Sequence, residues 1–95
     1  MAGWDARLRY VDISLSPVQV AANTSASQTF DIPGVRSDDM VIGVNKPTHQ
    51  AGLGIVGARV VAEGQVAIVF GNFTAAGITP TASETYSFGL LTKQP

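Results

Sequence analysis

The sequence predicts an all-β fold, an antiparallel β-sandwich of about seven short strands in an immunoglobulin-like or jelly-roll-like arrangement. Two observations lead to this prediction. Apolar and polar residues alternate with a period of two in many short segments, which is the pattern of a half-buried strand. In addition, 10 Gly and 5 Pro residues interrupt the chain too often for an apolar stripe to continue through three turns of a helix.

The first part of the chain contains three expected strands. Residues 9–16 carry an apolar side chain at every second position, and Pro17 ends or kinks this strand because its nitrogen has no hydrogen to donate. Residues 18–22 alternate again and are expected as the second strand. Residues 23–27 are a polar turn, and residues 28–32 follow as the third strand.

Turn residues separate the later strands, which are expected at residues 38–44, 55–61, 65–72 and 84–92. Pro33-Gly34 predicts a type II turn, since Pro presets the first central dihedral angle and Gly accepts the positive φ of the second. Ala62-Glu63-Gly64 lies between two β-branched segments and predicts a hairpin. Residues 48–54 are expected to be irregular, and residues 73–80 are expected to form a loop or a short ribbon.

The alternation also predicts which side chains point inward. The expected core consists of Val11, Ile13, Leu15, Val20, Phe30, Ile32, Val41, Val60, Val66, Ile68, Phe70, Tyr86 and Phe88. Residues 1–9 have few apolar positions and are expected to form a short N-terminal arm, which either docks on a neighbouring molecule or is frayed in isolation. Residues 10–95 are expected to form a single β-sandwich domain.

Composition excludes several classes of function. The formal net charge is -1 and charged residues make up 14% of the chain, spread along it, which argues against binding to nucleic acid and against a polybasic membrane anchor. The chain has no Cys, which excludes disulfides and thiolate metal sites. No apolar segment is long enough for a signal peptide or a membrane span.

Three motifs have a functional interpretation that their context does not favour. Residues 52–57 match the G-x-G-x-x-G pattern, but a strand follows where a dinucleotide site needs a helix, so we expect no cofactor and assign Gly57 to a bulge or a close backbone approach. His49, the only histidine, is expected in a solvated loop. Asp38 and Asp39 lack the alternating oxygen ligands of a calcium site, so we expect no metal and assign them to capping a turn.

Four residues are candidate partner-binding positions, and none is a candidate catalytic residue. Trp4, Arg7 and Arg9 belong to the expected arm. Arg59 lies inside a strand, where its guanidinium either binds a carboxylate of this chain or of a partner, or points to solvent. Trp4, Phe73 and Tyr86 together would suit a sugar-stacking platform, but they lie on separate segments and fit core or contact positions better. No nucleophile has a paired base, so we expect no enzyme.

The order of turns and strands resembles a family of phage head proteins. The resemblance covers roughly residues 20 to 90 and rests on residues 22–35, 39–41, 45–47, 52–60, 66–72, 78–80 and 84–86. In this order these segments are similar to the small tailed-bacteriophage head proteins of the capsid decoration, or cement, type.

The resemblance implies a structural virion protein that binds the outer surface of a phage capsid and stabilises the expanded head. Its partners would be the major capsid protein and further copies of itself, as a trimer or dimer, with neither nucleic acid nor membrane involved. It would be made in the host cytoplasm and located on the capsid surface. An alternative is a receptor- or glycan-binding β-module of a phage fibre or tail, because similar β-modules occur there.

Overall fold

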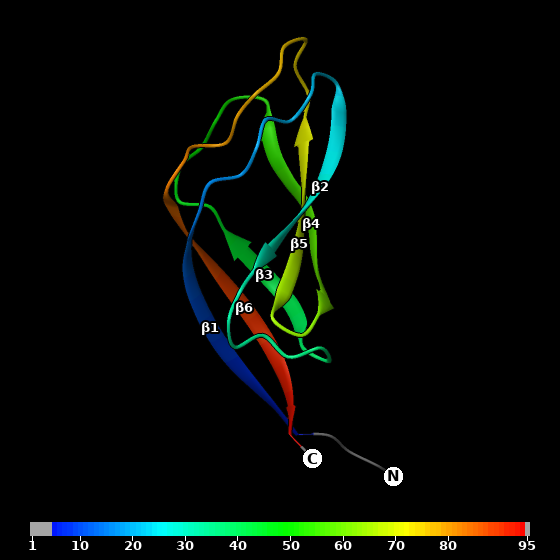
Figure 1. Ribbon diagram of the computed structural model, residues 1–95, viewed down its shortest axis with the longest axis vertical. Coiled ribbons are helices and arrows are strands. Elements are labelled where there is room, and N and C mark those ends of the chain that lie inside the picture. The colour runs from blue at the N-terminus through cyan, green and yellow to red at the C-terminus, as the bar shows by residue number, and fades with distance from the viewer. Residues whose placement is uncertain (1–4, 95) are drawn as a thin grey trace.

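The computed structural model describes residues 5–94 of the chain, and these form two three-stranded antiparallel sheets without a helix. The strands are β1 (Asp5–Leu15), β2 (Thr24–Asp31), β3 (Met40–Asn45), β4 (Leu53–Ala62), β5 (Gln65–Asn72) and β6 (Glu84–Gln94). One sheet has the order β1-β6-β3 and the other the order β2-β5-β4 (Figure 1). The all-β prediction is therefore confirmed.

The described residues contain six strands where about seven were expected. The difference lies in residues 18–22, which form only an isolated bridge between Val20 and Ile78. The side chain of Gln28 explains this, because its amide accepts from the Val18 N–H (2.9 Å) and donates to the Val18 carbonyl (3.0 Å). These bonds occupy backbone groups that would otherwise pair with a neighbouring strand.

Strand β1 begins at Asp5, so residues 5–9 of the expected arm are part of a sheet. Asp5 lies opposite Gln94 and Arg9 opposite Leu90, in continuous antiparallel register. The reason is that β6 also extends over 11 residues and offers β1 a pairing partner along its whole length. Residues 1–4 of the expected arm lie outside the described residues.

The turns predicted at Pro33-Gly34 and at Ala62-Glu63-Gly64 are confirmed. The polar turn predicted at residues 23–27 is wrong, because residues 24–27 belong to β2 and pair with β5. Gly34 has a φ of 95°, and the Val35 N–H donates to the Ile32 carbonyl across 3.3 Å, as a turn at Pro33-Gly34 requires. Glu63 and Gly64 connect β4 to β5 in a tight hairpin, in which Gly64 has a φ of 71°. These two turns reverse the chain at one end of the β2-β5-β4 sheet.

Every residue of the predicted core is either buried or packed against the buried cluster. Val35 and Leu90 are further members of the cluster, which draws side chains from both sheets. The molecule is elongated, with extents of 51 × 26 × 20 Å. β1 begins and β6 ends at one end of it, while the connection that follows β5 lies at the other end (Figure 1).

Candidate functional site

The outer face of the β1-β6-β3 sheet carries a group of exposed apolar side chains, which we call the apolar face. Its members, with the exposed fraction of each residue, are Leu8 (55%), Tyr10 (77%), Met40 (61%), Ile42 (53%) and Leu91 (36%). Isolated exposed apolar residues are ordinary, whereas a contiguous group on one sheet is a candidate interaction surface. The apolar face is therefore the first candidate for a binding function.

The strand register places these side chains in rows across the sheet. Leu8 on β1 and Met40 on β3 both lie opposite Leu91 on β6, so three apolar residues form one row. In the next row Tyr10 lies opposite Gly89. Because Gly89 has no side chain, a hollow of about 270 Å³ remains between Tyr10 and Ile42.

Sequence reasoning found only part of the apolar face. Alternation in residues 9–16 places Tyr10 on the face opposite Val11, and that is also where the structure has it. Leu8 was assigned to the arm, and the outward positions Met40 and Ile42 were not singled out. The same alternation predicts that Met40 and Ile42 point outward, since each is next in sequence to the inward-pointing Val41.

Arg9, a predicted partner-binding residue, makes its contacts within the chain. Its Nη2 donates to Oδ2 of Asp39 (2.7 Å) and to the Gly34 carbonyl (3.0 Å), and its Nε donates to Oγ1 of Thr92 (2.8 Å). The Arg9 side chain is 25% exposed and that of Asp39 is fully buried. Asp39 also accepts from the Arg36 N–H (2.9 Å), which confirms the predicted turn-capping role for this residue.

The environment of Asp39 favours its charged form. Burial by itself raises the pKa of this carboxyl, but hydrogen bonds from the Arg36 backbone, the Thr92 hydroxyl and the Arg9 guanidinium, together with the charge of Arg9, outweigh burial. The pKa of Asp39 therefore lies below its ordinary value. This cluster connects β1, β6 and the segment before β3 into one unit.

The structure separates the other predicted partner-binding residues. Arg7 is exposed on β1 opposite Thr92, and Arg59 is exposed on β4 of the second sheet, opposite Ala67. Arg59 also borders a surface hollow of about 380 Å³ between β3 and β4. Trp4 lies outside the described residues. The described candidates therefore do not converge on one site.

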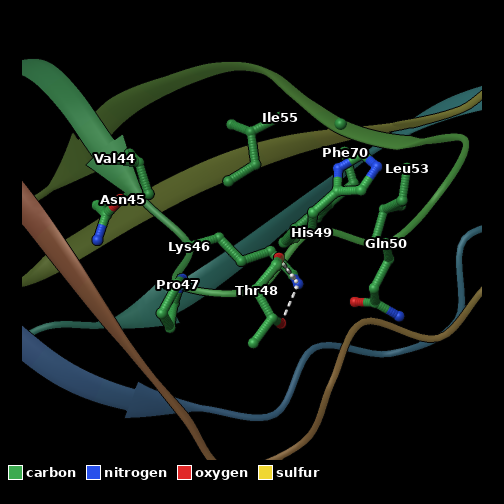
Figure 2. A pocket seen from close by; sticks show the side chains of 11 residues that line it. Val44, Asn45, Lys46, Pro47, Thr48, His49, Gln50, Leu53, Ile55 and Phe70 are labelled. Atoms are coloured by element: carbon green, nitrogen blue, oxygen red, sulfur yellow. Dashed lines mark hydrogen bonds between the residues drawn. The ribbon is translucent and has the colours of Figure 1, made fainter.

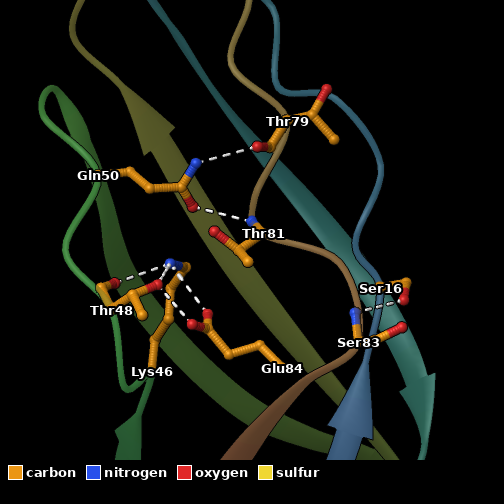
Figure 3. A network of polar contacts seen from close by, with 8 residues as sticks. All are labelled: Ser16, Lys46, Thr48, Gln50, Thr79, Thr81, Ser83 and Glu84. Carbon is orange, nitrogen blue, oxygen red and sulfur yellow. Dashed lines mark hydrogen bonds and ion pairs between the residues drawn. The ribbon is translucent and has the colours of Figure 1, made fainter.

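A second polar cluster connects the 46–52 loop to β6 (Figure 3). Lys46 Nζ lies 3.2 Å from the Glu84 carboxylate and donates to the carbonyl (2.8 Å) and hydroxyl (3.2 Å) of Thr48. The Thr48 hydroxyl in turn donates to Glu84. The amide of Gln50 bridges to residues 79 and 81, since it donates to the Thr79 carbonyl (3.1 Å) and accepts from the Thr81 N–H (2.9 Å).

The pKa values of two groups at this cluster, Glu84 and Tyr86, are shifted from their ordinary values. The hydrogen bond from Thr48 is the largest influence on Glu84 and lowers its pKa; burial opposes this, and Lys46 adds to it. Burial, followed by the negative charge of Glu84, raises the pKa of Tyr86 to about 12. The Tyr86 hydroxyl is buried without a hydrogen-bond partner among the described residues. It is therefore held in its neutral form.

The 46–52 loop also borders an open hollow of about 380 Å³ (Figure 2). His49 is exposed at its wall, Lys46 is engaged with Thr48 and Glu84, and Ile55 and Phe70 supply apolar lining. Within residues 5–94, no group of three or more His, Cys, Asp or Glu side chains is placed to hold a metal ion. The polar side chains of Lys46 and Gln50 at this hollow are therefore already engaged in hydrogen bonds that hold the loop.

The glycine motif has a structural role in β4. Gly52 occupies a turn with a φ of 81°, and Gly54 and Gly57 lie within the strand. The register between β4 and β5 shifts between Ile55 and Gly57, which is where the sequence indicated a bulge or a close backbone approach.

The three aromatic residues considered for a sugar-stacking platform are not brought together. Tyr86 is fully buried within the core, and Trp4 lies outside the described residues. Phe73 is 72% exposed and follows β5 of the other sheet.

Comparisons with known proteins add no assignment to this geometry. The described part of the chain contains no helix with the length and apolar character needed to cross a membrane. No protein-family model matches the chain, and searches of curated proteins and of solved structures gave no match.

Proposed function

We propose that this chain is a structural virion protein that binds the outer surface of a phage capsid and stabilises the expanded head. The observation that carries the proposal is the apolar face, in which Leu8, Leu91 and Met40 form a row in register across three strands. A rigid sheet that presents apolar side chains suits a protein that docks by its surface. The resemblance of residues 20 to 90 to capsid decoration proteins supplies the identity of the partner.

The size of the apolar face fits docking at many weak sites. Three strands spaced about 4.8 Å apart, over two outward rows about 7 Å apart, cover on the order of 200 Å². A stable interface between two proteins buries about 800 Å² on each partner. A single contact of this size is weak, but many copies that bind the assembled shell and not its separate subunits would sum to a large stabilisation.

The proposal also covers the binding partners of the chain, its location and the arrangement of its two sheets. Its partners are the major capsid protein and other copies of the chain, as a trimer or dimer, and its location is the capsid surface. No catalytic role, nucleic acid or membrane is part of it. The two sheets would form an immunoglobulin-like or jelly-roll-like sandwich, which the single core cluster shared by both sheets supports.

The test uses purified heads that lack the protein. Wild-type protein is expected to cosediment with expanded heads and to raise the temperature at which they rupture. The double variant Leu8→Ser, Met40→Ser removes two exposed apolar groups from the apolar face and is expected to lower the bound fraction about tenfold, since each group contributes roughly 0.5–1 kcal/mol when half buried.

Val18→Ser is the matched control, because Val18 is 67% exposed but lies outside the apolar face, in the connection between β1 and β2. It is expected to bind as wild type does. Absence of wild-type cosedimentation with expanded heads would overturn the proposal. Equal binding by the double variant and the control would show that the apolar face is not the surface that binds the head.

A further inference from the structure

The connection after β5 displays an exposed aromatic ring on a fixed support. Phe73 is 72% exposed, yet its backbone N–H donates to the Gly52 carbonyl across 2.8 Å. The preceding residue, Asn72, is buried and uses both ends of its amide. Its Nδ2 donates to the carbonyls of Val20 (3.0 Å) and Ala76 (2.8 Å), and its Oδ1 accepts from the N–H (2.9 Å) and hydroxyl (2.7 Å) of Thr74.

These bonds hold the backbone on both sides of Phe73. A ring on such a backbone loses little conformational entropy when a ligand binds to it, and preorganisation of this kind improves affinity. A single exposed apolar side chain is ordinary by itself, so the surface around Phe73 decides whether the ring belongs to a binding site.

Two glycines, Gly54 and Gly71, lie beneath the Phe73 ring. A Cβ added at Gly71 would lie 3.0 Å from Cζ of Phe73 and 3.5 Å from Cγ2 of Val56, and one added at Gly54 would lie 3.8 Å from Cε2 of Phe73. Gly54, Gly71 and Ser25 are cross-strand neighbours on β4, β5 and β2. Because two of the three have no side chain, the Phe73 ring lies over the two glycines, and a slot borders the ring on the side of β2.

The slot is defined by Asn23, Thr24, Ser25, Val56, Gly71, Asn72 and Phe73, and its volume is about 410 Å³. This lies in the range of small-molecule sites, about 300–1,000 Å³. Phe73 and Val56, which is 60% exposed, provide the apolar side. On the other side, the side chains of Asn23 and Ser25 make no hydrogen bond with the described residues and are open to a ligand.

The lining of the slot selects among ligand classes. None of its residues is titratable, so it offers no counter-charge to an anion or a cation. A purely apolar ligand would cover the Asn23 amide and the Ser25 hydroxyl without satisfying them. A ligand with one apolar face and neutral hydroxyl groups around it matches both sides. A pyranose ring has this structure, because its axial C–H groups form an apolar face and its hydroxyls project from the edge.

We propose that the slot beside Phe73 binds a neutral hexopyranose unit, with the C–H face of the sugar against the Phe73 ring and its hydroxyls bonded to Asn23 and Ser25. This inference goes beyond head binding and is independent of it, since the slot lies on the β2-β5-β4 sheet and the apolar face on the other. A sugar site at the end of the molecule remote from the start of β1 leaves the apolar face accessible (Figure 1).

The test is a titration of the isotope-labelled protein with the methyl glycosides of D-glucose, D-galactose and D-mannose, followed by NMR. At least one is expected to bind with a Kd on the order of 1–10 mM, since a ligand of this size has few atoms to contribute. The shifts should be confined to Ser25, Val56, Gly71 and Phe73 and their neighbours. The Kd should be the same at about pH 5 and about pH 8, because no lining group titrates.

Four variants distinguish this site from nonspecific contact. Phe73→Ala is expected to raise the Kd about tenfold, whereas Phe73→Tyr retains the ring and keeps it within about threefold. Asn23→Gly is expected to raise it severalfold, and Gly tolerates the φ of 52° that Asn23 adopts. Tyr10→Ala is the matched control, since Tyr10 is a comparably exposed aromatic residue on the other sheet, and it should leave the Kd unchanged.

Several results would overturn the proposal. One is the absence of shifts with every glycoside at about 50 mM, well above the expected Kd. Another is equal binding by wild type and Phe73→Ala. A third is a set of NMR shifts that change with protein concentration in the absence of sugar and are lost in Phe73→Ala. Such shifts would mean that a second copy of the chain occupies the slot. Head cosedimentation of Phe73→Ala should equal that of wild type whichever result is found, so failure here is distinct from failure of the proposed function.

Discussion

Arg9 on β1 donates to the fully buried carboxylate of Asp39 across 2.7 Å, and Asp39 lies just before the first residue of β3. The pair therefore connects two strands that do not pair with each other, because β6 lies between β1 and β3. The Arg9 side chain is 25% exposed and that of Asp39 is fully buried. Loss of Arg9 therefore leaves a buried carboxylate without its cation, whereas loss of Asp39 leaves a guanidinium that water can reach.

Removal of Arg9 is expected to destabilise the fold more than neutralisation of Asp39. Arg9→Met leaves a buried carboxylate without its cation, at a cost of about 3 kcal/mol in the free energy of unfolding. Asp39→Asn leaves a guanidinium that water can reach and keeps an acceptor for the Arg36 N–H, at a cost of about 1–2 kcal/mol. Urea denaturation of both variants measures the difference.

Arg7→Met is the control for this comparison. Arg7 lies two residues earlier on the same strand and is exposed, so its replacement should change the free energy of unfolding by less than about 0.5 kcal/mol. An equal loss in Arg7→Met and Arg9→Met would contradict the role assigned to the Arg9–Asp39 pair.

Stability is expected to fall in acid. The folded-state pKa values of Asp39 and Glu84 both lie below their ordinary values of 3.8 and 4.5. The unfolded chain therefore takes up protons before the folded protein does, so the stabilisation is fully present above about pH 5 and decreases as the pH falls through 4.5 and below. Urea midpoints measured between about pH 2 and pH 7 should show this decrease.

The double variant Asp39→Asn, Glu84→Gln should be less stable at neutral pH and should lose most of this acid dependence, because both perturbed carboxyls are gone. An acid decrease of undiminished size in the double variant would mean that other groups are responsible.

Tyr86 is expected to produce the opposite dependence in alkali. Its folded-state pKa is raised from 10.0 to about 12, so between these values the unfolded chain loses a proton that the folded protein keeps. Stability should therefore decrease as the pH rises above 10. The decrease should be absent in Tyr86→Phe, as measured by thermal unfolding over this range.

Tyr86→Phe is also expected to be as stable as wild type at neutral pH, or more stable by up to about 1 kcal/mol. The Tyr86 hydroxyl is buried without a hydrogen-bond partner among residues 5–94, so its removal eliminates a desolvated polar group and leaves the ring in place. A loss of more than about 2 kcal/mol would indicate that this hydroxyl has a partner.

Gly52 and Gly43 are expected to differ in their tolerance of a side chain. A Cβ at Gly52 would overlap Cγ2 of Thr74, and its φ of 81° is unfavourable for other residues, so Gly52→Ala should cost about 2–4 kcal/mol. A Cβ at Gly43 meets no atom within 4 Å, and Gly43→Ala should be nearly neutral. Comparable stability of the two variants in urea would contradict this assignment.

Local patterns were sufficient for most of the fold. Alternation placed Val11, Ile13 and Leu15 on one face, and the structure has them in or against the core. The hairpin at Glu63 and Gly64 was predicted because its turn residues have a specific backbone requirement that is visible in a few adjacent letters. Such features depend on near neighbours in the chain.

Contacts between distant residues were not predicted. Residues 18–22 alternate like a strand, but the side chain of Gln28 takes the backbone groups of Val18. Arg9 was predicted to meet a partner, but it binds Asp39, which is 30 residues away in sequence. Nothing near either residue indicates these pairings, because they depend on how the strands are ordered in the sheets.

The sequence by itself determined that the chain is all-β, that it turns at Pro33-Gly34 and at Glu63-Gly64, and which side chains form most of the core, since strand period and turn dihedral angles are properties of neighbouring residues. The tertiary structure decided which strands share a sheet, and hence that Leu8, Leu91 and Met40 align and that Phe73 lies over Gly71 and Gly54 beside Ser25. These arrangements depend on strand register, and register is set by the packing of the whole core.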